Sequence, residues 1–194
     1  MKKSVFLLFA VFAVIFQLAA APGPWFTGKV GRQLVNASGK PVPAASLKGK
    51  MVGFYFSAHW CPPCRKFTPQ LVKFYKKVSK KHNFEIVFVS SDRNSKAMQK
   101  YMKEAGMPWL AIPHGAPQIK ALQQEFKVSG IPTLIVLDRN GRVVSKSARM
   151  DVARHGEKAI DLWEKGSHAV PGMKNKAPNK NKKAKSSKKV QTKR

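Results

Sequence analysis

The distribution of apolar and polar residues predicts an α/β domain in the middle of the chain. Two near-continuous apolar runs, Met51–Ser57 and Phe84–Ser90, are typical of strands covered on both faces. Between them, over residues 62–80, apolar side chains recur at spacings of three and four, which predicts an amphipathic helix with its lysines outside. The apolar positions of this helix are Phe67, Leu71, Phe74, Tyr75 and Val78.

Weaker patterns predict the remaining elements. Turn residues at 36–39 and 138–141 indicate two hairpins, and residues 22–28 are expected to form an exposed lead-in. The expected elements are a hairpin over 33–47, helices over 95–105, 118–126 and 151–165, and a second hairpin with strands Thr133–Leu137 and 142–146. This order favours a central mixed β-sheet flanked by helices, with an N-terminal hairpin extension.

The first residues of the chain have the layout of a secretory signal. Lys2 and Lys3 precede an apolar run over 5–16, and three alanines follow at 19–21. We therefore predict a signal peptide over 1–21 and an exported protein, periplasmic or secreted. Because the cleavage position is poorly defined, an uncleaved membrane anchor over 5–21 stays open as an alternative.

The opposite end of the chain is strongly basic. The whole chain carries 37 Lys and Arg against 9 Asp and Glu, and residues 174–194 hold nine lysines and one arginine without an acid. This composition predicts a disordered, lysine-rich tail over 173–194, which leaves a single domain over 22–172. One interpretation of the tail is a solubilising role, and the other is binding to an anionic surface or to nucleic acid.

The chain has only two cysteines, Cys61 and Cys64, three positions apart. A bridge across two residues closes too small a loop to stabilise a fold much. A structural zinc site needs four ligands, and neither a second cysteine pair nor histidines at ligand spacing accompany this one, so we expect no metal. Redox chemistry by the pair itself, with no other cofactor, is the favoured interpretation.

The cysteine pair opens the predicted helix within the motif Trp60-Cys61-Pro62-Pro63-Cys64. The unpaired N–H groups and the dipole of a helix N-terminus stabilise a thiolate, and such settings lower a thiol pKa from about 8.5 to roughly 3.5–7.5. Cys61 is therefore the expected nucleophile and Cys64, one turn deeper, the resolving thiol. Pro62 and Pro63 suit the first helical turn, which they stiffen.

Three neighbours complete the candidate site. Trp60 precedes the nucleophile and can shield it, and we expect it to face the substrate together with the two prolines of the motif. His59 and Arg65 place positive charge on either side, which favours the thiolate form of the nucleophile.

These motifs resemble the thioredoxin superfamily, in particular its tryparedoxin and nucleoredoxin branch. The resemblance covers about residues 45–152. Four blocks in the right order carry it: FYFSAHWCPPCR at 54–65, FTPQL at 67–71, MPWLAIP at 107–113 and IPTL at 131–134. The resemblance implies a thioredoxin fold and exchange of disulfides with protein substrates.

The resemblance also assigns roles to residues outside the cysteine motif. It implies that Pro132 is a catalytic cis-proline facing the cysteines, and that the backbone of Ile131 offers a strand edge to a substrate segment. It further implies that Trp109 and Trp60 frame the site, although Trp109 as a plain core residue is the alternative. Tyr55 stands where thioredoxins often bury an aspartate, so we expect no buried carboxylate base.

The leading hypothesis is an exported thiol-disulfide oxidoreductase that exchanges a Cys61–Cys64 dithiol with protein thiols and disulfides, acting as a monomer. As a reductant, it needs electrons from a membrane donor. One alternative is a thioredoxin-like factor for cytochrome c maturation. Another is a basic module that binds an anionic polymer through residues 174–194 while its cysteines stay idle.

Overall fold

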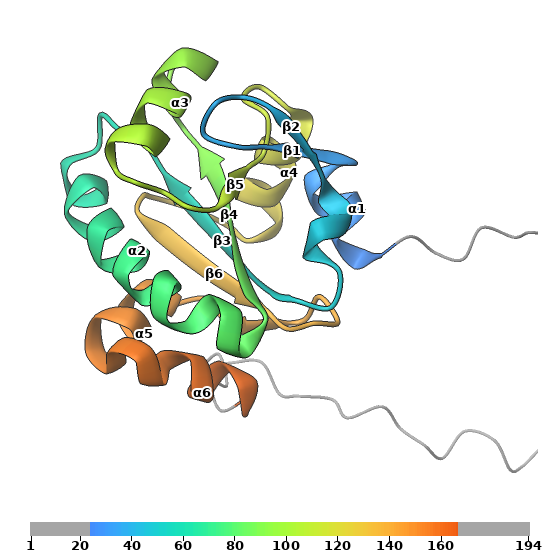
Figure 1. Ribbon diagram of the computed structural model, residues 1–194, viewed down its shortest axis with the longest axis vertical. Helices are drawn as coiled ribbons and strands as arrows, with labels where there is room; N and C mark the ends of the chain where they lie inside the picture. The colour runs from blue at the N-terminus through green and yellow to red at the C-terminus, as the bar shows by residue number, and fades with distance from the viewer. Residues whose placement is uncertain (1–23, 167–194) are drawn as a thin grey trace, which may run out of the picture.

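The structure is a computed structural model that describes residues 24–166 (Figure 1). The predicted signal peptide, the lysine-rich tail and both predicted domain limits lie outside these residues. The elements are, in chain order, α1 Trp25–Val30, β1 Gln33–Val35, β2 Pro41–Pro43, the 3₁₀ turn η1 Ala44–Leu47, β3 Met51–Ser57, α2 Pro62–His82, β4 Phe84–Ser90, α3 Ser95–Glu104, β5 Leu110–Ala111, α4 Pro117–Glu125, β6 Thr133–Leu137, β7 Val143–Ser145, α5 Ala148–His155, η2 Gly156–Lys158 and α6 Ala159–Glu164.

The described residues form one seven-stranded sheet in the order β2-β1-β5-β4-β3-β6-β7. The central strand β3 pairs parallel with β4 and antiparallel with β6, so the prediction of a mixed sheet is confirmed. The hairpin of β1 and β2 is also confirmed, and β1 joins it to the sheet by pairing with β5. Among residues 24–166, none of the helices combines the length and apolarity needed to cross a membrane.

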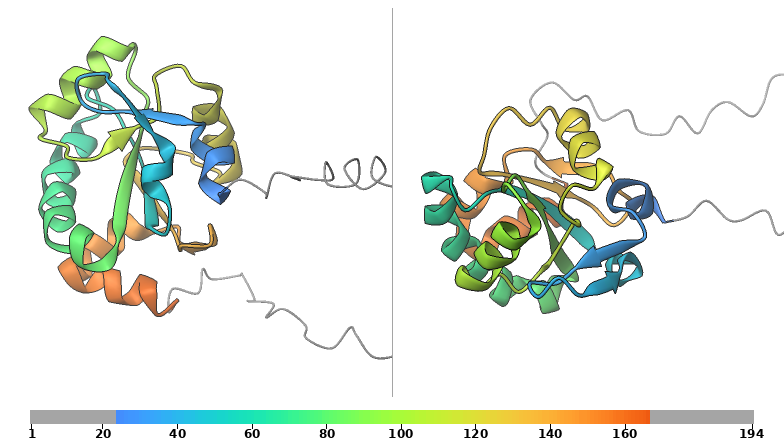
Figure 2. Two further views of the ribbon diagram at one scale, coloured as in Figure 1. Left: turned by 45° about the vertical axis from the view of Figure 1, so that its right-hand side comes forward. Right: turned by 90° about the horizontal axis from the view of Figure 1, so that it is seen from above.

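Both faces of the sheet are covered, which explains why its central strands read as continuous apolar runs. Along β3, Met51 and Tyr55 belong to one core cluster, and Phe54 and Phe56 belong to the other. The first cluster includes residues of α2, α3, α5 and α6, and the second includes residues of α1 and α4. Both views of Figure 2 place α1 and α4 on the side of the sheet opposite α2 and α5.

The structure differs from the sequence predictions at three places. Residues 25–28 are not an exposed lead-in, because α1 buries Phe26 against the second core cluster. The two-residue strand β5 was not predicted at all. The closing helix expected over 151–165 begins earlier, at Ala148, and is interrupted at Gly156, whose φ of +55° is a backbone conformation that suits glycine.

The strand pairing determines where the candidate site lies. β3 leads into the cysteine motif at its carboxyl end, and the parallel strand β4 ends at the same edge of the sheet. The antiparallel register pairs Phe56, near the end of β3, with Thr133, the first residue of β6. The residues just before β6 therefore lie beside the start of α2, where the cysteines are.

Candidate active site

Cys61 is the N-cap of α2 and forms a disulfide with Cys64. Pro62 and Pro63 fill the first two helical positions and carry no N–H. The next amide, that of Cys64, donates to the sulfur of Cys61 at 3.3 Å, and the amide of Arg65 donates to the carbonyl oxygen of Cys61 at 3.1 Å. The first free amide of the turn is therefore aimed at one sulfur atom, as the motif predicts.

The two sulfur-bearing residues differ in their access to solvent. Cys64 is completely buried, whereas Cys61 is 5% exposed. The neighbouring Trp60 is 56% exposed, and Pro62 and Pro63 are exposed as well. A partner that approaches this edge of the sheet therefore meets an apolar surface, and it reaches Cys61 before Cys64.

The residues before β6 lie against the disulfide. The peptide bond between Ile131 and Pro132 is cis, as the resemblance implies. The sulfur of Cys61 lies 3.7 Å from the carbonyl oxygen of Ile131. Both Ile131 and Pro132 are partly exposed, so the structure brings them together with the cysteines, while their roles in catalysis and substrate binding stay predictions.

The loop that carries the motif is held by the residues that follow β4. The indole N–H of Trp60 donates to the carbonyl oxygen of Ser91 at 3.0 Å, and the amide of His59 donates to the carboxylate of Asp92 at 2.8 Å. Asp92 is only 7% exposed, and its second carboxylate oxygen accepts a hydrogen bond from Ser90 at 2.8 Å. These contacts fix the backbone immediately before Cys61.

Asp92 is a site residue that the sequence analysis missed. Its one available signal is its position, because it follows a buried strand that runs parallel to β3 and ends at the same edge. The backbone carbonyl of Asp92 also lies 2.8 Å from a ring nitrogen of His114, which ties the segment after β5 to the same loop.

The two predicted sources of positive charge differ in the structure. The imidazole of His59 faces Glu104 of α3 at 3.4 Å, and Glu104 also pairs with Lys100 at 3.7 Å. Arg65 is exposed and has no carboxylate partner within residues 24–166. Arg65 therefore contributes the less compensated charge beside the motif.

Trp109 lies in the core beneath this edge of the sheet. It is buried in the first core cluster, where its ring makes edge contacts with Tyr55 at 6.3 Å and Tyr75 at 5.4 Å between ring centroids. Only 2% of Trp109 is exposed, so direct contact of this ring with a substrate stays a prediction that its burial does not support. The core interpretation fits, and Trp60 alone presents an exposed indole at this edge.

Tyr55, which the resemblance aligns with a position where thioredoxins often bury an aspartate, points its hydroxyl at Thr68 of α2, with 2.7 Å between the oxygens. Thr68 in turn donates to the carbonyl oxygen of Cys64 at 2.9 Å. Burial raises the pKa of Tyr55 well above its usual range, so this phenol stays protonated at every pH at which the protein is expected to work.

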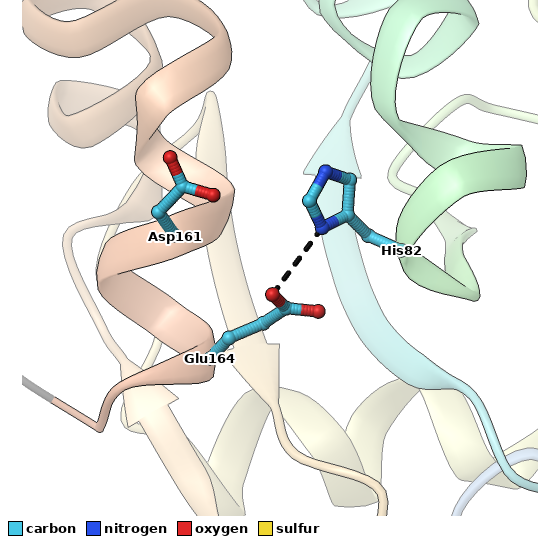
Figure 3. A group of neighbouring side chains, drawn as sticks. All are labelled: His82, Asp161 and Glu164. Carbon is cyan, nitrogen blue, oxygen red and sulfur yellow. Dashed lines mark ion pairs between the residues drawn. The ribbon is translucent and has the colours of Figure 1, made fainter.

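A second group of titratable side chains lies at the other end of α2. Figure 3 shows His82, Asp161 and Glu164, whose candidate ligand atoms all lie within 4.8 Å of one another. His82 forms an ion pair with Glu164 at 3.3 Å, and Arg139 approaches the same carboxylate at 3.4 Å. This group links α6 to the end of α2. It is about 30 Å from the cysteines along a 21-residue helix, at 1.5 Å per residue.

Comparisons with known proteins agree with this geometry. The thioredoxin-like family model matches residues 49–143. Probable nucleoredoxin 1 of Arabidopsis thaliana is 44% identical over 132 residues, which are 68% of this chain and 22% of that protein. Human nucleoredoxin is 42% identical over 135 residues, which are 66% of this chain and 31% of that protein.

The solved structure of tryparedoxin from Trypanosoma brucei matches more completely. It is 38% identical with a TM-score of 0.64, and the match covers 71% of this chain and 96% of that one. By contrast, the chain spans between about a fifth and a third of the length of the two nucleoredoxins. The fold is thus the thioredoxin fold, and the Cys61–Cys64 disulfide is that of a redox protein. The chain belongs to the thioredoxin-like family, in the branch that contains the tryparedoxins and nucleoredoxins.

Proposed function

We propose that the protein is a thiol-disulfide oxidoreductase that acts on protein disulfides through Cys61 and Cys64. The observation that carries the proposal is the position of Cys61 as the N-cap of α2, where the backbone amide of Cys64 points at its sulfur. That amide and the helix dipole stabilise a thiolate at Cys61, and the thiolate is the attacking form in disulfide exchange. Cys61 is also the more exposed of the two cysteines.

The reaction follows from this arrangement. The Cys61 thiolate attacks one sulfur of a client disulfide, forms a mixed disulfide and releases the other client sulfur as a thiolate, which takes a proton from water. Cys64 then loses its proton to solvent and attacks the sulfur of Cys61. The Cys61–Cys64 bond forms while the bond from Cys61 to the client breaks. The client gains two electrons and the cysteine pair is oxidised.

Reduction of insulin disulfides, with a chemical dithiol as electron donor, tests the proposal. Wild-type protein should accelerate the reduction, and Cys61→Ser should be inactive because it lacks the attacking sulfur. Lys120→Ala, a change on the exposed face of α4, serves as a matched control that should behave like wild type. No acceleration by wild type, or equal rates for wild type and Cys61→Ser, would refute the enzymatic role.

We further propose that the protein is exported and works in the periplasm or outside the cell, which the apolar segment over 1–21 supports. In an oxidising compartment a reductant needs a membrane electron donor, whereas an oxidant does not. The equilibrium potential of the cysteine pair against glutathione distinguishes the two directions, because a reductant has the more negative value. Mass spectrometry of the protein recovered from outside the cytoplasm tests export and shows whether residues 1–21 are removed.

A further inference from the structure

Four buried hydroxyl groups lie together beside Cys64. Tyr55 and Ser57 come from β3, Thr68 from α2 and Tyr101 from α3, and each residue is at most 2% exposed. The hydroxyl oxygen of Thr68 lies 2.7 Å from that of Tyr55 and 2.6 Å from that of Tyr101. Ser57 completes the group at 3.3 Å from the hydroxyl of Tyr101. We refer to these four residues as the hydroxyl cluster.

Counting hydrogens fixes the direction of the bonds around Thr68. A hydroxyl group has one hydrogen and two lone pairs. The carbonyl oxygen of Cys64 can only accept, so Thr68 gives its one hydrogen to it, at 2.9 Å. Tyr55 and Tyr101 must then both donate to Thr68. Three O–H dipoles are therefore directed toward the backbone of Cys64, positive ends leading.

Charged groups face this region from the neighbouring elements but do not join the cluster. The ring of His59 packs on the ring of Tyr101, with 5.4 Å between centroids. The imidazole of His59 pairs with Glu104, and its amide is bonded to Asp92. Ile131, whose carbonyl oxygen lies 3.7 Å from the sulfur of Cys61, and the adjacent Pro132 are uncharged. Within residues 24–166, no carboxylate is hydrogen-bonded to the hydroxyl cluster or to Cys64.

We infer that Thr68, supported by Tyr55 and Tyr101, is a positioning residue that favours the thiolate of the resolving Cys64 in place of a buried carboxylate. The inference rests on the proposed function. Cys64 is completely buried, and burial opposes formation of a thiolate. The aligned hydroxyl dipoles point their positive ends at the backbone carbonyl oxygen of Cys64. Their field therefore lowers the cost of a negative charge on the sulfur of the same residue.

In this scheme the cluster takes up no proton. The proton of the Cys64 thiol passes to solvent, the thiolate attacks the sulfur of Cys61, and the client leaves as a thiolate. A carboxylate at the position of Tyr55 would titrate and add its own ionisation to the pH profile. Because neutral hydroxyl groups do not titrate in this range, the pH profile of the resolving step should depend on the ionisation of Cys64 alone.

A coloured aromatic disulfide measures the two steps separately. Mixing the fully reduced protein with one equivalent of this disulfide releases a first coloured thiol when Cys61 attacks and a second when Cys64 resolves. Stopped-flow measurement over a pH series gives a profile for each phase, and Cys64→Ser, which lacks the second phase, confirms the assignment. The informative variants are Thr68→Val, which removes the hydroxyl at constant shape, and Thr68→Ser, which restores it.

We expect Thr68→Val to shift the profile of the second phase to higher pH and leave the first phase unchanged. A shift of one pKa unit slows the second phase about tenfold at neutral pH, because the thiolate fraction falls tenfold. Thr68→Ser should lie within about twofold of wild type. Tyr75→Phe removes a partly buried hydroxyl that is bonded to Glu85, away from the cluster, and should match wild type as a control.

Superimposable second-phase profiles for wild type and Thr68→Val would overturn the inference, and so would equal losses in Thr68→Val and Thr68→Ser. Should Thr68→Val fail to fold, Tyr55→Phe and Tyr101→Phe carry the same test. Each of these variants should shift the pH profile of the second phase to higher pH, but by less than Thr68→Val would. If neither profile moves, the inference is overturned. If wild type releases neither thiol, the proposed function fails instead.

Discussion

Replacing Asp92 with alanine should destabilise the protein and loosen the loop before Cys61. The carboxylate accepts two hydrogen bonds of 2.8 Å, one from the amide of His59 and one from the hydroxyl of Ser90. A hydrogen bond to a charged group contributes about 1.5–3 kcal/mol. Because the bond from the amide of His59 is only part-buried, we take the lower end for each bond, which gives about 3 kcal/mol in total.

Urea unfolding of the oxidised protein measures this loss as the difference in the free energy of unfolding. Asp92→Asn should lose about half as much, because the amide oxygen keeps one acceptor. Asp161→Ala is the matched control, since the carboxylate of Asp161 is exposed and makes no hydrogen bond or ion pair in the described residues, and it should change stability by less than about 0.5 kcal/mol. The first, Cys61-dependent phase of disulfide exchange should also slow in Asp92→Ala. A loss below about 0.5 kcal/mol with unchanged exchange would refute the role given to Asp92.

Three further predictions concern backbone conformation, alkaline pH and surface charge. Gly141→Ala should destabilise the protein by more than about 1 kcal/mol in urea unfolding, because φ is +79° and a new Cβ would lie 2.7 Å from the ring of Trp25; unchanged stability would contradict this. Burial and Glu85 raise the pKa of Tyr75 above its ordinary value of 10.0, so its contribution to stability is complete below pH 10 and is lost as the pH rises further. Tyr75→Phe should therefore reduce the fall in stability between pH 10 and 11, and an unaltered slope would contradict it. Arg65→Glu should raise the pKa of the Cys61 thiol, which can be measured from the ultraviolet absorbance of the thiolate. The rise should be larger at low salt than at high salt, and a pKa that does not depend on salt would contradict this prediction.

The sequence predicts the central elements well because their signals are local. Strands β3 and β4 are covered on both faces and therefore read as apolar runs, and α2 buries one regular stripe. Helix α1 escapes prediction because its six residues give too short a pattern. Strand β5 has only two residues, and it exists because β4 and β1 pair with it on either side.

The candidate site likewise contains residues that the sequence predicts and residues that it does not. The order of residues in the Cys61 motif is sufficient to predict an N-cap cysteine with prolines in the first turn, and the structure confirms it. The contacts of Asp92 and Thr68 escape prediction because each depends on strand pairing or helix packing between distant segments. The two interpretations of Trp109 stay open at the level of sequence for a related reason, since its sequence block does not reveal whether the ring faces the core, where it lies, or the surface.

Trapping of a mixed disulfide tests the central claim most directly. The protein with Cys64→Ser can attack a client disulfide through Cys61 but has no second thiol to release it, so it should accumulate a covalent adduct that mass spectrometry locates on Cys61. The protein with Cys61→Ser should form far less adduct, because its remaining cysteine is completely buried. Adducts of equal yield in both variants, or in neither, would contradict the assignment of Cys61 as the attacking sulfur.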